Sequence, residues 1–206
     1  MDVTLYTAVI ILCAAFLFLG IRLAGRLPTP WVTGVFALAA ILFISLFALQ
    51  WFVWFVGDTL ILLLSLSAGK TLGRIINSWQ ALITFCLALA VLDLLSFYFG
   101  PTASLIAGFR QGNTLPLQYL SISVPMGEEI QPIMGIGDTM ALATAYATLT
   151  RLRYPAGWSF LAPLAGLLMA MAVGLAVGGI FALPFMTGAL IAYILMDQKL
   201  ARRGGP

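Results

Sequence analysis

The sequence predicts an all-α, multi-pass membrane protein, and three observations point to this class. The chain has 206 residues, of which 62% are hydrophobic and only 8% are charged, and its mean hydropathy is +1.08. A soluble domain is nearer half apolar and a quarter charged. The apolar residues also come in runs about as long as a membrane-crossing helix, roughly 20 residues. A water-soluble fold cannot cover this much apolar surface, so soluble classes are excluded.

Apolar runs divide residues 1–206 into about seven predicted spans that form a single membrane domain. The first run lacks a basic leader and a small-residue cleavage site, so we expect a span and not a signal peptide. The double-length run from Trp31 to Ala68 has to turn once, between Gln50 and Asp58, and supplies two spans. The third span is the weakest, because its short apolar part runs into Lys70. The predicted spans are residues 3–21, 31–49, 52–69, 79–99, 133–152, 158–180 and 182–196, with a long outer loop at 100–132.

The placement of positive charge is an independent check on this count. With seven spans, Arg110 alone among the ten Lys and Arg residues falls on one side of the membrane. Basic residues are enriched in cytoplasmic loops. We therefore place the N-terminus and the 100–132 loop outside and the C-terminus in the cytoplasm. The basic residues on the cytoplasmic side are Arg22, Arg26, Lys70, Arg74, Arg151, Arg153, Lys199, Arg202 and Arg203.

The chain has no histidine, which removes Ser-His-Asp and Cys-His triads, histidine-based zinc sites and histidine haem ligation. Cys13 and Cys86 both lie in apolar runs, so we interpret them as core residues and not as a disulfide or metal pair. We expect no metal and no cofactor. The net charge of +3 is interpreted as membrane orientation and not as nucleic-acid binding, because the basic residues never cluster with exposed aromatic residues.

Two of the seven carboxylates, Asp93 and Asp138, lie inside predicted spans. A charged side chain within the bilayer costs several kcal/mol by most estimates and marks a functional site by default. At about 1.5 Å per residue, Asp93 lies roughly 9 Å below the outer end of its helix and Asp138 roughly 7–8 Å below the outer end of the next. Because these helices are consecutive and antiparallel, we expect the carboxylates to face each other. By contrast, Asp58 follows Gly57 and precedes Thr59, and is interpreted as a helix N-cap.

Two carboxylates in contact at low dielectric share one proton and titrate as a unit. Aspartic proteases use this arrangement, in which one carboxylate activates water and the other polarises the substrate carbonyl. Composition alone favours a catalytic and a non-catalytic interpretation equally. In the non-catalytic one, the pair is an inter-helix hydrogen bond that holds the bundle together or part of an ion pathway.

Three short motifs appear in order along the chain. Leu92-Asp93 lies in one span, Gly135-Ile136-Gly137-Asp138 begins the next, and Ala182-Leu183-Pro184 begins the last. Glycines before a carboxylate let the backbone bend and let another chain approach closely. In this order the motifs resemble those of the presenilin and signal peptide peptidase family of GxGD intramembrane aspartyl proteases. The resemblance covers about residues 79–196, and the first three spans match only as hydrophobic segments.

The sequence also departs from the family's pattern. Leu92 stands where the family has Tyr, and Phe181 stands where it has the first Pro of Pro-Ala-Leu-Pro. The family usually has nine spans, so its first two have no counterpart among the seven predicted here. The prepilin peptidases also carry Gly-x-Gly-Asp, but they typically have a basic residue soon after that Asp, where this chain has Thr139-Met140. They are the runner-up protease interpretation.

The resemblance implies a fold like the C-terminal part of presenilin, with Asp93 and Asp138 as the catalytic pair. It implies that the substrate is a single-span membrane protein or a signal-peptide remnant within the lipid bilayer. With the loop between the aspartates outside, the orientation resembles that of signal peptide peptidase and is opposite to that of presenilin. The residues carried over as substrate-binding motifs are Gly135, Gly137, Ala182, Leu183 and Pro184.

The outer segment contains two local patterns. Residues Tyr119–Val124 alternate polar and apolar, which favours a strand able to pair with an unwound substrate, although a plain hairpin or loop fits as well. Pro101–Phe109 favours a short amphipathic helix at the membrane interface. Two non-enzymatic classes stay open, a proton-coupled transporter and an inactive presenilin-like protein, and so does a homo-oligomer.

Overall fold

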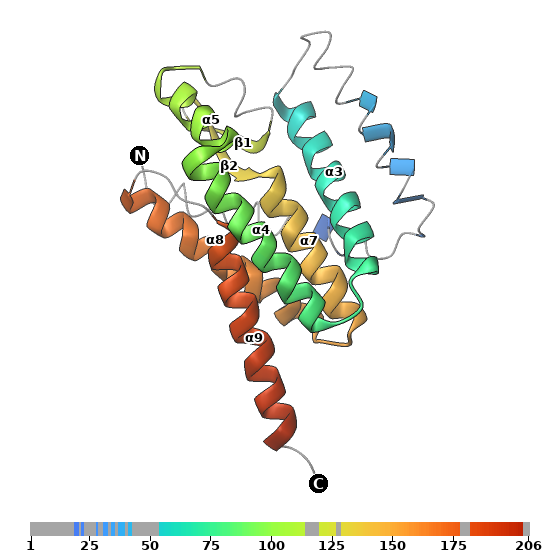
Figure 1. The fold of residues 1–206 in the computed structure, drawn as a ribbon. Helices are drawn as coiled ribbons and strands as arrows, with labels where there is room; N and C mark the ends of the chain where they lie inside the picture. Colours follow the sequence, from blue (N-terminus) through green and yellow to red (C-terminus); the bar gives the residue numbers. More distant parts are fainter. Residues whose placement is uncertain are drawn as a thin grey trace.

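A computed structural model describes residues 19–20, 22, 28, 31–32, 34–35, 37–39, 41–42, 54–113, 120–126, 129–177 and 182–203. The predicted spans 3–21 and 31–49 therefore lie largely outside the described residues. Helices make up 85% of the residues described. The all-α prediction holds for most of these residues and needs one correction, a two-stranded antiparallel hairpin (Figure 1).

The elements follow one another as α3, α4, α5, β1, β2, α7, α8 and α9. Three of the described helices, α3, α4 and α8, are long and apolar enough to cross a membrane by length and composition, and the apolar part of α9 is shorter. The bounds are α3 Trp54–Ile75, α4 Trp79–Phe99, α5 Pro101–Arg110, β1 Ser121–Met126, β2 Glu129–Gly135, α7 Ile136–Arg151, α8 Ala156–Val177 and α9 Leu183–Arg203.

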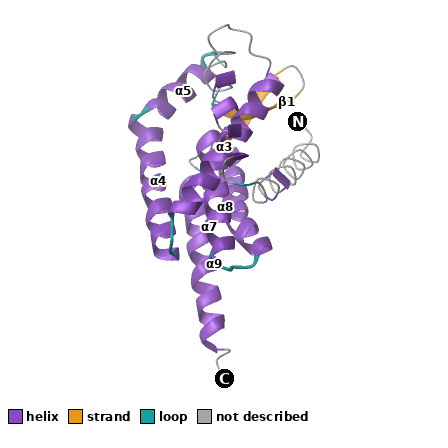
Figure 2. Cartoon of the chain, turned by 90° about the vertical axis from the view of Figure 1, so that its right-hand side faces the viewer, coloured by secondary structure: helices purple, strands orange, loops and turns teal. Residues whose placement is uncertain are grey.

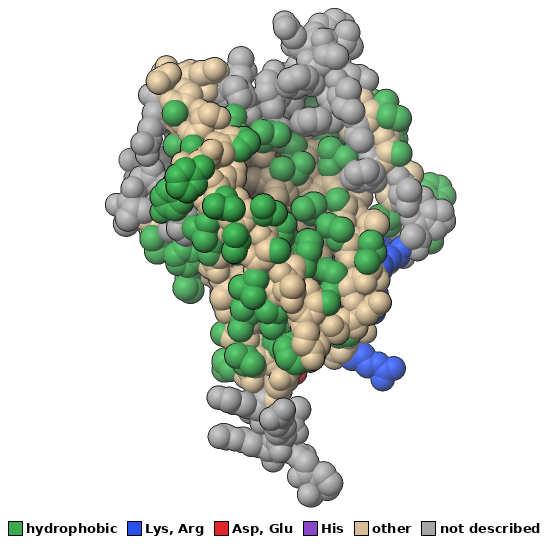
Figure 3. All heavy atoms as spheres, viewed as in Figure 1, with side chains coloured by type: hydrophobic (Ala, Val, Ile, Leu, Met, Phe, Trp, Pro, Cys, Tyr) green, Lys and Arg blue, Asp and Glu red, His purple; other side chains and the backbone are tan. Residues whose placement is uncertain are grey.

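The surface of this bundle is strongly apolar. Hydrophobic side chains cover much of the face seen in Figure 3, and the blue Lys and Arg side chains lie low on its right-hand side. Large apolar residues are exposed along α4, among them Phe99 at 87% and Tyr98 at 61%. Such a surface is compatible with contact with lipid.

The third span is longer than predicted. The sequence placed its end at residue 69 because Lys70 follows, but α3 continues to Ile75 and Lys70 is only 7% exposed. The continuation is explained by packing, because Gly69 and Gly73 lie against α7. A Cβ atom on Gly69 would come within 2.5 Å of the Ala143 Cβ, so glycine is required for the two helices to approach this closely.

The predicted outer loop 100–132 is largely structured. The expected helix at Pro101–Phe109 is confirmed as α5, which begins at a proline directly after α4 ends. The Thr102 and Ser96 hydroxyl groups are 2.7 Å apart and link α5 to α4. The strand expected at 119–124 is confirmed as β1 from Ser121 onward, while Tyr119 lies outside the described residues.

The span predicted at 133–152 begins too early. Residues 133–135 belong to β2, and α7 begins only at Ile136. The reason is cross-strand pairing, because Ser121 pairs with Gly135 and Ile122 with Met134. An apolar Ile-Met pair in front of a helix looks like part of that helix until its partner strand is known.

α7 is the central helix of the described bundle. It contacts α3, α4 and α8, and α9 packs against both α8 and α4. Every residue from Ala141 to Tyr146 is buried. α8 and α9 cross closely at Gly166, where a Cβ atom would lie 2.6 Å from the Met186 Cα. Beyond this crossing, α9 extends past the other helices toward the C-terminus (Figures 1 and 2).

Candidate active site

Asp93 lies on α4 and connects it to the start of α9. The side chain is partly buried, and its Oδ2 atom accepts a hydrogen bond from the Leu183 amide at 3.4 Å. Leu183 is the first residue of α9, and the first amides of a helix have no partner within the helix. A carboxylate is favourable there because helix N-termini carry partial positive charge. Asp93 is therefore oriented by the Ala-Leu-Pro motif that the sequence singled out.

Asp138 is the third residue of α7 and is oriented by the residue that precedes the helix. Its Oδ2 atom accepts a hydrogen bond from the Gly135 amide at 3.1 Å. Gly135 is the last residue of β2, so the hairpin leads directly into this carboxylate. A Cβ atom at Gly135 would lie 3.2 Å from the same Oδ2 atom, which explains why a residue without a side chain suits this position.

The two aspartates lie toward the same end of the bundle, the end that carries the hairpin. α4 packs against α7, with Asp93 in the last third of α4 and Asp138 in the first turn of α7. Each carboxyl group is also held by a backbone amide at the start of a different helix.

The other motif residues surround this pair in different ways. A Cβ atom at Gly137 would meet no atom within 4 Å, so no described neighbour packs against this glycine. Leu183 is buried at 8% exposure, and Ala182 and Pro184 are partly exposed. The carbonyl group that Pro184 deprives of a helical amide belongs to residue 180, which lies outside the described residues.

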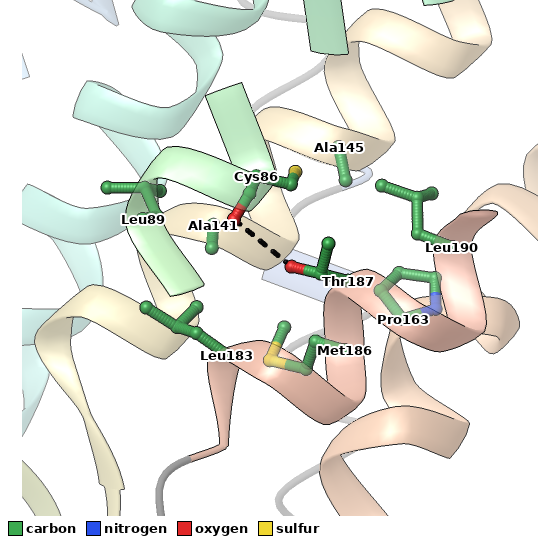
Figure 4. Close-up of a pocket in the computed structure, with 9 residues that line it drawn as sticks. All are labelled: Cys86, Leu89, Ala141, Ala145, Pro163, Leu183, Met186, Thr187 and Leu190. Carbon is green, nitrogen blue, oxygen red and sulfur yellow. Dashed lines mark hydrogen bonds between the residues drawn. The ribbon is translucent and has the colours of Figure 1, made fainter. Parts of the chain in front are cut away.

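A small apolar cavity lies between α4, α7, α8 and α9 (Figure 4). Leu89, one turn before Asp93 on α4, and Leu183 both line it. The Thr187 hydroxyl donates a hydrogen bond to the Cys86 carbonyl oxygen across the same space at 3.2 Å. Cys86 is buried at 6% exposure, so its interpretation as a core residue is confirmed, whereas Cys13 lies outside the described residues. The bundle interior next to the aspartates is therefore apolar.

The sequence missed a third carboxylate in this region, Asp58. It was interpreted as an N-cap, but α3 already begins at Trp54, so Asp58 is the fifth residue of the helix. Both of its carboxylate oxygens accept the Ser123 amide, at 3.2 and 3.1 Å. The sequence offered one signal for this contact. Asp58 is a carboxylate at the start of an apolar run, and the alternating polar-apolar strand pattern that contains Ser123 lies 65 residues later. The sequence alone did not show that the two segments meet.

The opposite end of the bundle carries basic residues. The Arg151 guanidinium group donates hydrogen bonds to the carbonyl oxygens of Arg74, in the last turn of α3, and of Ile76, just after the helix. Cationic side chains suit the C-terminal end of a helix, where carbonyl groups lack helical partners. The two aspartates and these arginines thus lie at opposite ends of the helical bundle.

Comparison with protein-family models, with curated proteins and with solved structures finds no match to this chain. The resemblance to presenilin and signal peptide peptidase therefore rests on the ordered motifs. Of the two departures, Leu92 is 60% exposed on α4, and Phe181 lies outside the described residues. Within the part of the chain that the structure describes, no three His, Cys, Asp or Glu side chains group as metal ligands.

Proposed function

We propose that this chain is an intramembrane aspartyl endopeptidase that cleaves single transmembrane helices with Asp93 and Asp138. The observation that carries the proposal is that Asp93 and Asp138 lie on packed helices of an apolar bundle, each held by a backbone amide of one of the sequence motifs. Two aspartates from separate helices are expensive to bring together in such a setting. A function that needs two adjacent carboxyl groups accounts for that cost.

In the proposed mechanism one carboxyl group is ionised and the other is protonated. The ionised group takes a proton from a water molecule, whose oxygen attacks the scissile carbonyl carbon, while the protonated group donates its proton to the carbonyl oxygen. As the resulting diol collapses, one of its hydroxyl groups returns a proton to the ionised carboxylate, the C–N bond breaks, and the leaving nitrogen takes up the proton held by the other carboxyl group. Oδ2 of each aspartate is held by a backbone amide, so we assign Oδ1 to the water and the substrate.

A helix hides its carbonyl groups in its own hydrogen bonds, so the substrate has to unwind before cleavage. We place the unwound segment as a strand beside β2, because β2 ends at Gly135, three residues before Asp138. Strand addition uses main-chain hydrogen bonds and tolerates varied side chains. β1 is the less suitable strand, because the Ser123 amide is already bonded to Asp58.

We further propose that the aspartate end faces outside and that the C-terminus is cytoplasmic. This proposal is supported by the position of Arg74 and Arg151 at the other end of the described bundle. Substrates are then spans with a cytoplasmic N-terminus, such as signal-peptide remnants. A protease-protection experiment on a tag inserted near residue 112 tests the orientation. A tag that is protected inside the cell would show that the aspartate end faces the cytoplasm, contrary to this proposal.

Reconstitution with a fluorescent single-span substrate tests the activity. The unmodified chain should release product, and Asp93→Asn and Asp138→Asn should each reduce the rate to the uncatalysed level. Asp197→Asn, a carboxylate near the far end of α9, is the matched control and should retain activity. Absence of cleavage by the unmodified chain at every lipid composition and pH tested would refute the enzymatic proposal. Cleavage by either Asp93→Asn or Asp138→Asn would show that the two aspartates are not the catalytic pair.

One observation favours a non-enzymatic alternative. Each aspartate already accepts a backbone amide, and Asp93 thereby joins α4 to α9, so the pair could serve as a structural link or proton relay. In that case the unmodified chain should cleave nothing, and Asp93→Asn should lower thermal stability or proton flux into vesicles. Measuring flux and cleavage on the same proteoliposomes separates the two functions.

A further inference from the structure

Asp58 makes a long-range contact that the proposed mechanism does not use. The side chain is partly buried on α3, and both carboxylate oxygens accept the amide of Ser123, at 3.2 and 3.1 Å. A carboxylate that loses part of its hydration needs replacement donors, and hydrogen bonds with an ionised partner are the stronger kind. The bond joins two elements 65 residues apart in the chain, so its role is tertiary.

The surroundings of this contact are built for close approach. Ser121 and Ser123 are 4% and 2% exposed, and Gly57, next to Asp58, is also buried. The Ser123 hydroxyl donates to the Ser121 carbonyl oxygen at 3.4 Å, so this polar group is bonded within its own strand. Small side chains on both elements let the β1 backbone lie against α3. The strand is seated on the helix at the position of the carboxylate.

The hairpin needs support at this point. Ser123 pairs with Pro132 of β2, and the register shifts between Ile122 and Ser123. Proline has no amide hydrogen to donate to a neighbouring strand, so the ladder is short of one donor here. Asp58 supplies an external anchor for β1 where the pairing with β2 is irregular.

The same hairpin transmits its position to the aspartate pair. Beyond the irregularity, Ser121 pairs with Gly135, and the Ile136 amide donates to the Leu120 carbonyl oxygen at 3.1 Å. The Gly135 amide then holds Asp138. A continuous path of hydrogen bonds and strand pairing thus runs from Asp58 through β1 and the end of β2 to Asp138.

We propose that Asp58 is a positioning residue that docks the hairpin on α3 and thereby sets the placement of Asp138 and of the substrate strand beside β2. This inference rests on the proposed protease function. Asp58 touches neither the substrate nor the reacting atoms, and it acts only through Ser123 and the hairpin. Loss of the contact should therefore lower kcat and spread cleavage over neighbouring peptide bonds, with a smaller effect on KM.

The test compares Asp58→Ala and Asp58→Asn with the unmodified full-length protein in lipid nanodiscs. Leu63→Ala is the matched control on the same helix, where the leucine side chain is 37% exposed. Hydrogen exchange of the β1 amides reports the contact, and product mass spectrometry reports kcat, KM and the cleavage positions. A displacement of about 1 Å in an active site costs on the order of 100-fold in rate.

Asp58→Ala should speed exchange at the Ser123 amide, lower kcat by about 10- to 100-fold and spread cleavage over neighbouring bonds. Asp58→Asn keeps one acceptor oxygen without the charge, so exchange and kcat should fall between those of the alanine variant and the unmodified chain. Leu63→Ala should leave Ser123 exchange, kcat, KM and the cleavage positions unchanged. Unchanged Ser123 exchange, or unchanged kcat with the same cleavage positions, in Asp58→Asn and in a folded Asp58→Ala protein would overturn the proposal.

Failure of the positioning role and failure of the protease function give different results. Asp93→Asn should abolish cleavage and leave Ser123 exchange protected, because the docking contact is intact. If the unmodified chain cleaves nothing, the protease function is lost, and exchange in Asp58→Ala still decides whether the contact exists. If cleavage is normal in Asp58→Ala, only the positioning role is lost.

Discussion

Replacing Gly69 by alanine should destabilise the protein, although alanine is the better helix former. A Cβ atom at this position would lie 2.5 Å from the Ala143 Cβ and 2.7 Å from the Met140 carbonyl oxygen. Carbon atoms in ordinary contact are about 3.5–4.0 Å apart, so α3 and α7 would have to separate by about 1 Å or more. Overpacking of this kind costs about 1–3 kcal/mol, and the gain in helix propensity offsets about 1 kcal/mol of it.

The expected net effect is a loss of up to about 2 kcal/mol, measured as the free energy of unfolding in mixed micelles. Gly188→Ala is the matched control, since a Cβ atom there would meet no atom within 4 Å. That variant should be more stable by up to about 1 kcal/mol, because only the propensity term changes. The two glycine-to-alanine substitutions therefore have opposite predicted signs.

A shift of α7 also moves Asp138, which lies five residues before Ala143 on the same helix. The Gly69→Ala variant should therefore lose about 10- to 100-fold in cleavage rate, whereas Gly188→Ala should not. Ala143→Gly in the Gly69→Ala background should restore only part of the stability, because the Met140 contact remains. Equal stability of the two single variants would refute the packing argument.

Three further predictions concern residues around the site. Gly137→Ala should fold with equal or greater stability, because a Cβ atom meets nothing within 4 Å, yet should raise KM if the substrate strand passes there. Thr187→Val removes the hydrogen bond to the Cys86 carbonyl oxygen and should cost about 0.6–1 kcal/mol in unfolding free energy. The pH profile of kcat/KM should be bell-shaped, because the mechanism needs one ionised and one protonated carboxyl group in the pair.

Each of these has a result that contradicts it. A Gly137→Ala protein with unchanged KM would move the substrate path away from that glycine. A Thr187→Val protein as stable as the unmodified chain would show that the α9-to-α4 hydrogen bond contributes nothing. A rate that rises monotonically with pH would be inconsistent with a shared proton between the two aspartates.

Residue composition and run length were sufficient for the helical class and for most helix positions in the described part of the chain. The predicted spans at 79–99 and 158–180 lie close to α4 and α8, because an unbroken apolar stretch with turn-forming ends has few other solutions. The motif pattern also singled out Asp93 and Asp138. An ionisable residue in an apolar run can be recognised from the sequence, because the free-energy cost of placing its charge in the membrane depends on the apolar residues around it in the chain.

Only the tertiary structure decided what those residues contact. The strand β2 was hidden inside a predicted span, since Ile133 and Met134 are apolar and the partner of Met134, Ile122, lies twelve residues earlier. The length of α3 past Lys70 depends on glycines that fit against α7. Asp58 looked like a local helix cap, and its partner proved to be the Ser123 amide. Sequence periodicity reports which side chains prefer an apolar setting, but hydrogen bonds between distant segments depend on how the elements pack, which no local pattern encodes.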